Sequence, residues 1–106
     1  MSPQRLLILG GTGEAASLAR AVVARFGETI ELTTALAGRT NRPGPLPGVV
    51  RIGGFGGAAG LAAYLKQHAI DRVIDATHPF AAEISASARQ ACDHIGVRRL
   101  MLMRPP

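Results

Sequence analysis

Cysteine and aromatic side chains are scarce in this sequence. Cys92 is the one cysteine among 106 residues, which excludes an internal disulfide and a cysteine-rich zinc site. Tryptophan is absent, and the aromatic residues are one tyrosine and three phenylalanines. A core with so few rings has to be built from Ala, Leu, Ile and Val, which is typical of closely packed α/β layers.

Long apolar runs are absent as well. No run approaches the ~18 residues of a membrane span, and the N-terminus lacks the apolar segment and cleavage site of a signal peptide. Hydrophobic residues still make up 47% of the chain, which is too many for a disordered protein. The length suits one domain over residues 1–106. We therefore expect a soluble, cytoplasmic, monomeric protein with no membrane partner.

Lysine is nearly lacking, because eleven of the twelve basic residues are arginine, and the net charge is +5. The arginines are scattered, with the pair Arg98-Arg99 as their longest run, and no aromatic residues are interleaved with them for base stacking. This pattern disfavours a nucleic-acid partner. It favours a small anionic ligand, since arginine binds phosphate and carboxylate groups through paired hydrogen bonds.

Strand-like and helical patterns alternate along the chain. Strands are predicted over residues 5–9, 29–36, 49–52, 72–75 and 97–103, and helices over 14–26, 58–68 and 84–95. This order predicts an α/β fold: a doubly wound, mostly parallel, Rossmann-like sheet of about five strands with flanking helices. Residues 38–48 carry no helical pattern and are predicted to be a loop. Cys92 falls on the apolar face of the last helix, which predicts a buried, unreactive thiol.

The first strand is followed by three glycines within four residues, and a helical pattern begins at once with Glu14. Glycines at such a turn let backbone N–H groups approach a phosphate, and the helix N-terminus behind them favours negative charge. The stretch therefore predicts a dinucleotide site. Its Gly-Gly-x-Gly spacing is one residue short of the usual fingerprint, and the alternative is a tight strand-to-helix turn that binds nothing.

Ligands of doubly wound sheets gather where the parallel strands end. Here four segments that follow strands are glycine-rich or polar: residues 10–13, 37–40, 53–57 and 77–80. The coincidence is more informative than any one loop. The cofactor-binding residues predicted from it are Gly10, Gly11, Thr12, Gly13, Glu14, Arg39, Thr40, Gly53, Gly54, Phe55, Gly56, Thr77 and His78.

The segment after the second strand predicts NADP rather than NAD. An NAD site commonly has an acid at this strand end to hold the ribose hydroxyls, but Glu31 lies too early, inside the strand. Arg39 and Thr40 stand there instead, and a guanidinium can pair with a 2′-phosphate. The alternative is an exposed loop arginine with no ligand.

His78 is the candidate catalytic residue, because it lies in the loop after the fourth strand and can orient a substrate or transfer a proton. The alternative is that His78-Pro79 shapes a turn. The three histidines are not spaced as a metal site, so no metal is expected. Asp75, just before this loop, is expected to brace the turn rather than to do chemistry.

Taken together, these segments resemble the precorrin-6A reductases of cobalamin biosynthesis. The segments that carry the resemblance are Ile8–Ala15, Leu36–Thr40, Val50–Gly57, Val73–Ala81 and Leu102–Pro106. Within them, Gly-Gly-Phe-Gly-Gly and Asp-Ala-Thr-His-Pro-Phe-Ala are specific, whereas the first glycine turn alone is not.

The resemblance implies an NADPH-dependent oxidoreductase that reduces precorrin-6A to precorrin-6B by hydride and proton delivery. The many carboxylates of this tetrapyrrole would suit an arginine-rich, acid-poor chain. Members of the family are considerably longer, with a second α/β domain after the Arg-Pro-Pro stretch. We therefore expect this chain to be the N-terminal, NADP-binding half. A non-catalytic NADP-binding or sensing module is the alternative.

Overall fold

The computed structural model describes residues 3–36, 46–77 and 81–102. The strands are β1 Gln4–Leu9, β2 Ile30–Leu36, β3 Val49–Ile52, β4 Arg72–Asp75 and β5 Arg98–Met101; the helices are α1 Gly13–Phe26, α2 Gly57–Gln67 and α3 Ala82–Ile95, with a 3-10 turn, η1, at Gly27–Thr29. The order of elements is the predicted one. β5 begins later than predicted because the Val97 N–H still bonds to the Cys92 carbonyl, 2.9 Å away, and so belongs to the end of α3.

The five strands form one sheet in the order β3-β2-β1-β4-β5, and every neighbouring pair is parallel. β1 lies at the centre, and the chain extends the sheet first on its β2 side and then on its β4 side. The strand order therefore reverses between β1 and β4, and the crevice at their carboxyl ends is where doubly wound folds bind ligands. The predicted sheet is confirmed, and it is wholly rather than mostly parallel.

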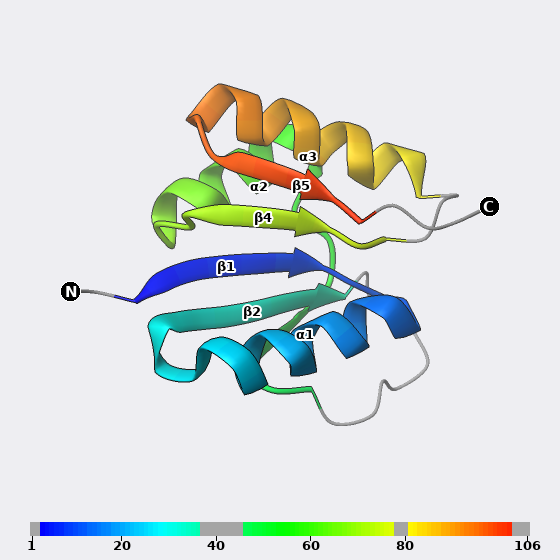
Figure 1. Ribbon diagram of the computed structural model, residues 1–106. Coiled ribbons are helices and arrows are strands. Elements are labelled where there is room, and N and C mark those ends of the chain that lie inside the picture. The colour runs from blue at the N-terminus through cyan, green and yellow to red at the C-terminus, as the bar shows by residue number, and fades with distance from the viewer. Residues whose placement is uncertain (1–2, 37–45, 78–80, 103–106) are drawn as a thin grey trace.

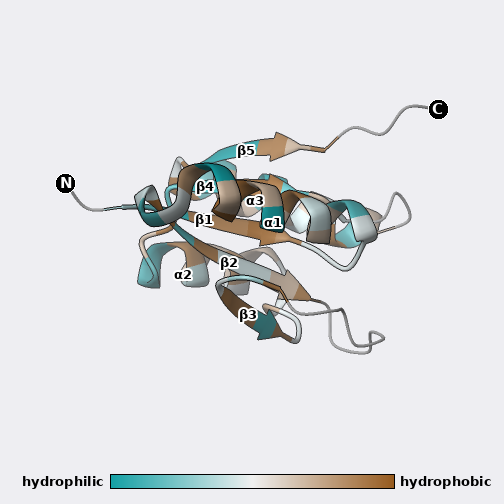
Figure 2. Ribbon diagram, turned by 60° about the horizontal axis from the view of Figure 1, so that its bottom comes forward, coloured by the Kyte–Doolittle hydropathy of each residue, from teal (hydrophilic) through white to brown (hydrophobic). Residues whose placement is uncertain are grey.

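Helices cover both faces of the sheet, with α1 on one face and the pair α2 and α3 on the other (Figure 1). Alternation along β1 explains this arrangement. Leu6 and Ile8 pack in the cluster under α1, whereas Leu7 and Leu9 pack in the cluster under α2 and α3. Because both faces are buried, β1 is apolar over most of its length (Figure 2).

The helices bury mostly small side chains. α1 presents Ala15, Ala19 and Val22 to the core, while Val23 and Phe26, which share its apolar pattern, are 36% and 46% exposed. Cys92 is 1% exposed on the inner face of α3, and this burial raises the pKa of its thiol although Arg99 opposes the rise. A neutral thiol follows, as predicted. In the described ranges no helix has the length and apolar character that a bilayer crossing needs.

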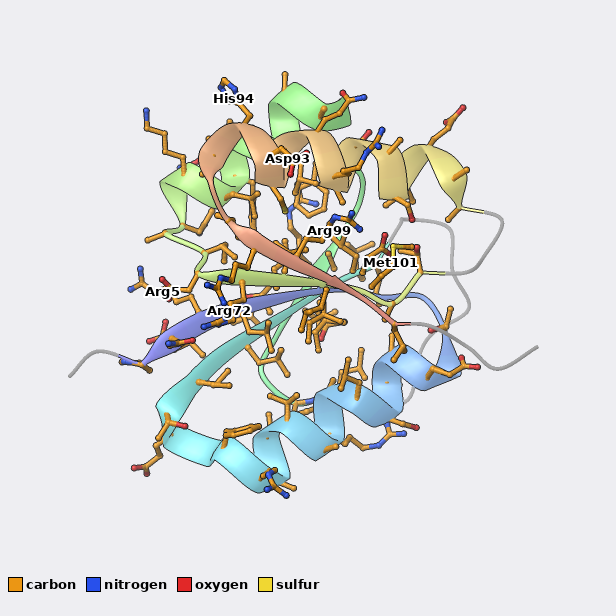
Figure 3. All side chains as sticks on the ribbon, turned by 45° about the horizontal axis from the view of Figure 1, so that its top comes forward. Arg5, Arg72, Asp93, His94, Arg99 and Met101 are labelled. Carbon is orange, nitrogen blue, oxygen red and sulfur yellow. The ribbon has the colours of Figure 1, made fainter. Side chains whose placement is uncertain are left out.

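Charged side chains concentrate at the end of the sheet where the strands begin. Arg5 Nε lies 3.0 Å from Glu31 Oε2, and the Arg5 backbone N–H donates to Asp71 Oδ2 at 2.8 Å. Figure 3 shows Arg5 and Arg72 at this end of the sheet, with Met101 at the opposite, carboxyl end. The Glu31 carboxylate is therefore paired far from the edge where a ribose would bind.

Candidate functional site

A cleft of about 230 Å³ lies at the carboxyl edge of the sheet, on the face covered by α2 and α3. It is bounded by the ends of β1 and β2, by the turn before α2, by the segment after β4 and by the first turns of α3. The lining residues are Leu9, Gly10, Ala35, Leu36, Gly53, Gly54, Phe55, Gly56, Gly57, Leu61, Thr77, Glu83, Ile84 and Ser87. Six of the thirteen predicted binding residues, Gly10, Gly53, Gly54, Phe55, Gly56 and Thr77, thus come together in one place.

The first glycine turn connects β1 to α1. A Cβ atom at Gly10 would lie 3.0 Å from Thr34 Cγ2, closer than an ordinary contact, so a larger residue there would require Thr34 on β2 to shift. Gly11 has φ +103°, a left-handed conformation that favours glycine. A Cβ at Gly11 or Gly13 would meet no atom of the described residues within 4 Å. Within the described part of the chain, side chains at these two positions next to the helix N-terminus would be unobstructed.

The Thr12 hydroxyl has a structural use in this turn. Thr12 Oγ1 accepts a hydrogen bond from the Ala15 N–H at 3.0 Å, which caps α1, and it donates to the Ala76 carbonyl at 2.9 Å. The cap thereby ties the turn after β1 to the end of β4. Gly11, Thr12, Gly13 and Glu14 lie at or before the α1 N-terminus and are not lining residues of the cleft. The Thr12 hydroxyl proton is already engaged, so the group that Thr12 can offer to a phosphate is its backbone N–H, and that role stays a prediction.

The second glycine turn connects β3 to α2. Gly53, Gly56 and Gly57 have φ values of +114°, +88° and +72°, so three of its positions require glycine. The Gly53 N–H donates to the Leu36 carbonyl at 2.9 Å, which ties the turn to the end of β2. This bond holds the turn beside the cleft, and the backbone of the turn forms much of the cleft wall.

The segment after β4 is braced by a buried carboxylate. Asp75 is 1% exposed, and its Oδ1 accepts from the Thr77 N–H at 3.1 Å and from Thr77 Oγ1 at 2.6 Å. Ser85 Oγ lies 3.3 Å from the same Thr77 hydroxyl. Among the described residues Asp75 Oδ2 has no hydrogen-bond partner. Asp75 thus braces the turn, as expected, and presents Thr77 to the cleft.

Arg39, Thr40 and His78 lie outside the described residues, and their roles stay predictions. Sequence reasoning missed the wall contributed by α3, namely Glu83, Ile84 and Ser87. The available signal was their spacing, because positions i, i+1 and i+4 of a first helical turn share a face. In the described ranges no three potential ligand side chains are grouped to hold a metal ion.

Comparisons with known proteins match nearly the whole chain. The sequence profile of the family described as "Precorrin-6x reductase CbiJ/CobK" matches residues 5–106. Precorrin-6A reductases from Rhodococcus erythropolis and from a Sinorhizobium species are each 50% identical to the chain, over 95% and 99% of its length. A solved structure, "CobK precorrin-6A reductase", is 48% identical over 97% of the chain, with a TM-score of 0.89. The chain spans about 40% of the length of each of these relatives.

Proposed function

The chain belongs to the precorrin-6x reductase family, and from that premise we propose that it is the nucleotide-binding half of an NADPH-dependent precorrin-6A reductase. The proposed reaction is the reduction of precorrin-6A to precorrin-6B in cobalamin biosynthesis. The substrate is taken from the names of the relatives. Residues 1–106 form the NADP-binding domain in this proposal, and its setting is the cytoplasm.

The observation that carries the proposal is that Gly10, at the start of the first glycine turn, and the whole second glycine turn line one cleft beside the reversal of strand order. Dinucleotides bind at this position in doubly wound sheets, with the pyrophosphate at the N-terminus of the first helix. The open space outside Gly11 and Gly13 fits such a group, since no described atom would block its approach to the backbone.

Different residues are assigned to different parts of the nucleotide. Gly11, Thr12 and Gly13 offer backbone N–H groups and Glu14 begins the helix behind them, while Gly53–Gly56 and Thr77 form the wall where the ring system of the cofactor and the substrate would meet. A bound NADPH would supply the hydride. His78 follows Thr77 directly, and we assign it to substrate binding or proton delivery beside this wall.

NADPH rather than NADH is proposed because no acid is free to hold the ribose hydroxyls where β2 ends. Glu31 is paired with Arg5 at the opposite end of the sheet. Arg39 and Thr40 remain the residues for the 2′-phosphate.

The deciding experiment titrates the chain with NADPH and with NADH and follows nicotinamide fluorescence. Arg39→Ala is expected to weaken NADPH binding about tenfold to a hundredfold, the value of one charge-assisted pair, and to leave NADH nearly unchanged. Arg42→Ala is given the same test, because Arg42 is the nearest rival of Arg39 for the 2′-phosphate. Equal losses for both nucleotides would refute the assignment of Arg39.

A second assay separates an enzyme from a binding module. NADPH oxidation is followed after addition of precorrin-6A, and the product is identified by its mass. The protein assayed is the complete reductase of which the proposal makes residues 1–106 the nucleotide-binding half. If that protein binds NADPH but does not oxidise it, the alternative of a non-catalytic NADP-binding or sensing module holds. If neither nucleotide binds, both versions of the proposal fail.

A further inference from the structure

We propose that Arg51 is the positioning residue that fixes the second glycine turn, Gly53–Gly57, in the shape that binds the nucleotide. Arg51 lies on β3, opposite Ala35 in the register of the sheet, and Ala35 belongs to the core under α2 and α3. The side chain therefore rises on the same face as the cleft, two residues before the turn begins. Only the identity of the ligand rests on the proposed function. The shape of the turn is tested in the nucleotide-free chain.

Both ends of the Arg51 guanidinium hold the backbone of the turn. Arg51 Nη1 donates to the Gly53 carbonyl at 2.8 Å, and Nη2 donates to the Gly54 carbonyl at 3.2 Å. Two successive carbonyl groups are thus turned toward the Arg51 side chain. Since the planar guanidinium presents its donors in a fixed fork, it sets the orientation of two peptide groups at once.

The flat face of the same guanidinium packs on aromatic rings. The Arg51 Cζ atom lies 4.0 Å from the centroid of the Phe55 ring and 5.3 Å from that of Tyr64. Phe55 in turn meets Tyr64 edge to face, with 5.1 Å between the ring centroids. The cation–π contact holds Phe55, the side chain of the turn that lines the cleft, against Tyr64 in the second half of α2.

The glycines of this turn are the reason that it needs such a support. A turn with four glycines among five residues has many accessible backbone conformations, so ordering it by the ligand alone would weaken binding. Arg51 orders the turn before the ligand arrives. No carboxylate among the described residues pairs with Arg51, so its hydrogen-bonding capacity is directed to the backbone of the turn.

A lysine at position 51 tests whether the geometry of the guanidinium group, or only its positive charge, holds the turn. Arg51→Lys keeps the charge, but an ammonium group has no planar face and no fixed fork. We expect amide hydrogen exchange at Gly53, whose N–H donates to the Leu36 carbonyl, to become at least about tenfold faster in the nucleotide-free chain of both Arg51→Lys and Arg51→Ala. Exchange in α3 is expected to stay as in the parent. The dissociation constant for NADPH should rise about tenfold to a hundredfold in both variants.

Arg20→Lys is the matched control, because Arg20 is exposed on α1, on the other face of the sheet. Circular dichroism and the melting temperature are measured for every variant, so that a loss of binding is compared at equal folding. Should Arg51→Ala fail to fold, Arg51→Lys carries the test.

Parent-like exchange and parent-like NADPH affinity in Arg51→Lys would overturn the proposal, because charge alone would then suffice. Faster exchange with unchanged affinity would also overturn it, since the shape of the turn would not matter for binding. If the parent chain does not bind NADPH, the proposed function fails. The exchange measurement then still decides whether Arg51 holds the turn.

Discussion

The two glycine turns lie at the same edge of the sheet but are held in different ways. The turn at Gly10–Gly13 is fixed from within, by the Thr12 hydroxyl that caps α1 and reaches the Ala76 carbonyl. The turn at Gly53–Gly57 has no side-chain cap on its helix and is fixed from outside, by Arg51 and the rings behind it. A glycine-rich turn can thus be supported by a side chain of its own or by side chains of the strand and helix beside it.

The two turns also differ in backbone conformation and in how closely they approach the helix that follows. The first requires one left-handed residue, Gly11, whereas the second requires three. Its Phe55 carbonyl approaches α2 so closely that a Cβ atom at Gly60 would overlap it. A change in the middle of α2 therefore reaches the second turn and leaves the first untouched.

The largest expected effect comes from Gly60→Ala. An added methyl group inside a helix ordinarily stabilises it by about 1 kcal/mol relative to glycine. Here it should destabilise the chain by about 1–3 kcal/mol, because the Phe55 carbonyl has to move. Urea unfolding measures the change in free energy. A gain in stability would show that the second turn does not press on the helix.

The next effect is expected in the first turn, from Thr12→Val. This variant keeps the shape of the side chain but loses the cap of α1 and the bond to Ala76, which together should cost about 1–2 kcal/mol of unfolding free energy. Thr12→Ser is the control and should stay close to the parent. If valine and serine behave alike in the same urea titration, the hydroxyl does not hold this turn.

The smallest effect on folding is expected for Gly13→Val. The new side chain would point into open space at a helical position, so the unfolding free energy should change by less than about 1 kcal/mol. NADPH affinity should nevertheless fall by at least about tenfold, because the side chain occupies the approach to the backbone. Fluorescence titration gives the affinity. Parent-like binding would place the phosphates elsewhere.

Most of the fold could be predicted from sequence because its signals are local. Apolar runs that end at glycine, helical spacing such as that of Ala88 and Ala91, and the alternation of the two patterns fix a parallel α/β sheet. The exact ends of the helices and strands were harder to predict from the sequence. η1 at Gly27–Thr29 delays β2 to Ile30, and the Val97 N–H extends the end of α3.

The candidate site was only partly predictable, because its support depends on registers across the sheet. Sequence spacing finds the glycines. It cannot show that β3 pairs with β2 so that Arg51 lies on the α2 and α3 face of the sheet, or that α3 brings Glu83 and Ser87 to the cleft wall. Nor does it show that the Thr12 hydroxyl is already engaged in capping. Side chains that act on a turn from another element have no local signature.

Tyr64 gives the chain a built-in optical probe. The protein has no tryptophan and a single tyrosine, and that ring lies against Phe55 on one side and 4.2 Å, centroid to centroid, from the His68 ring on the other. All intrinsic emission therefore originates from one place directly behind the second glycine turn. Tyrosine emission overlaps the absorption of a reduced nicotinamide, so occupancy of the cleft would be read as energy transfer from a donor of known position, without any label.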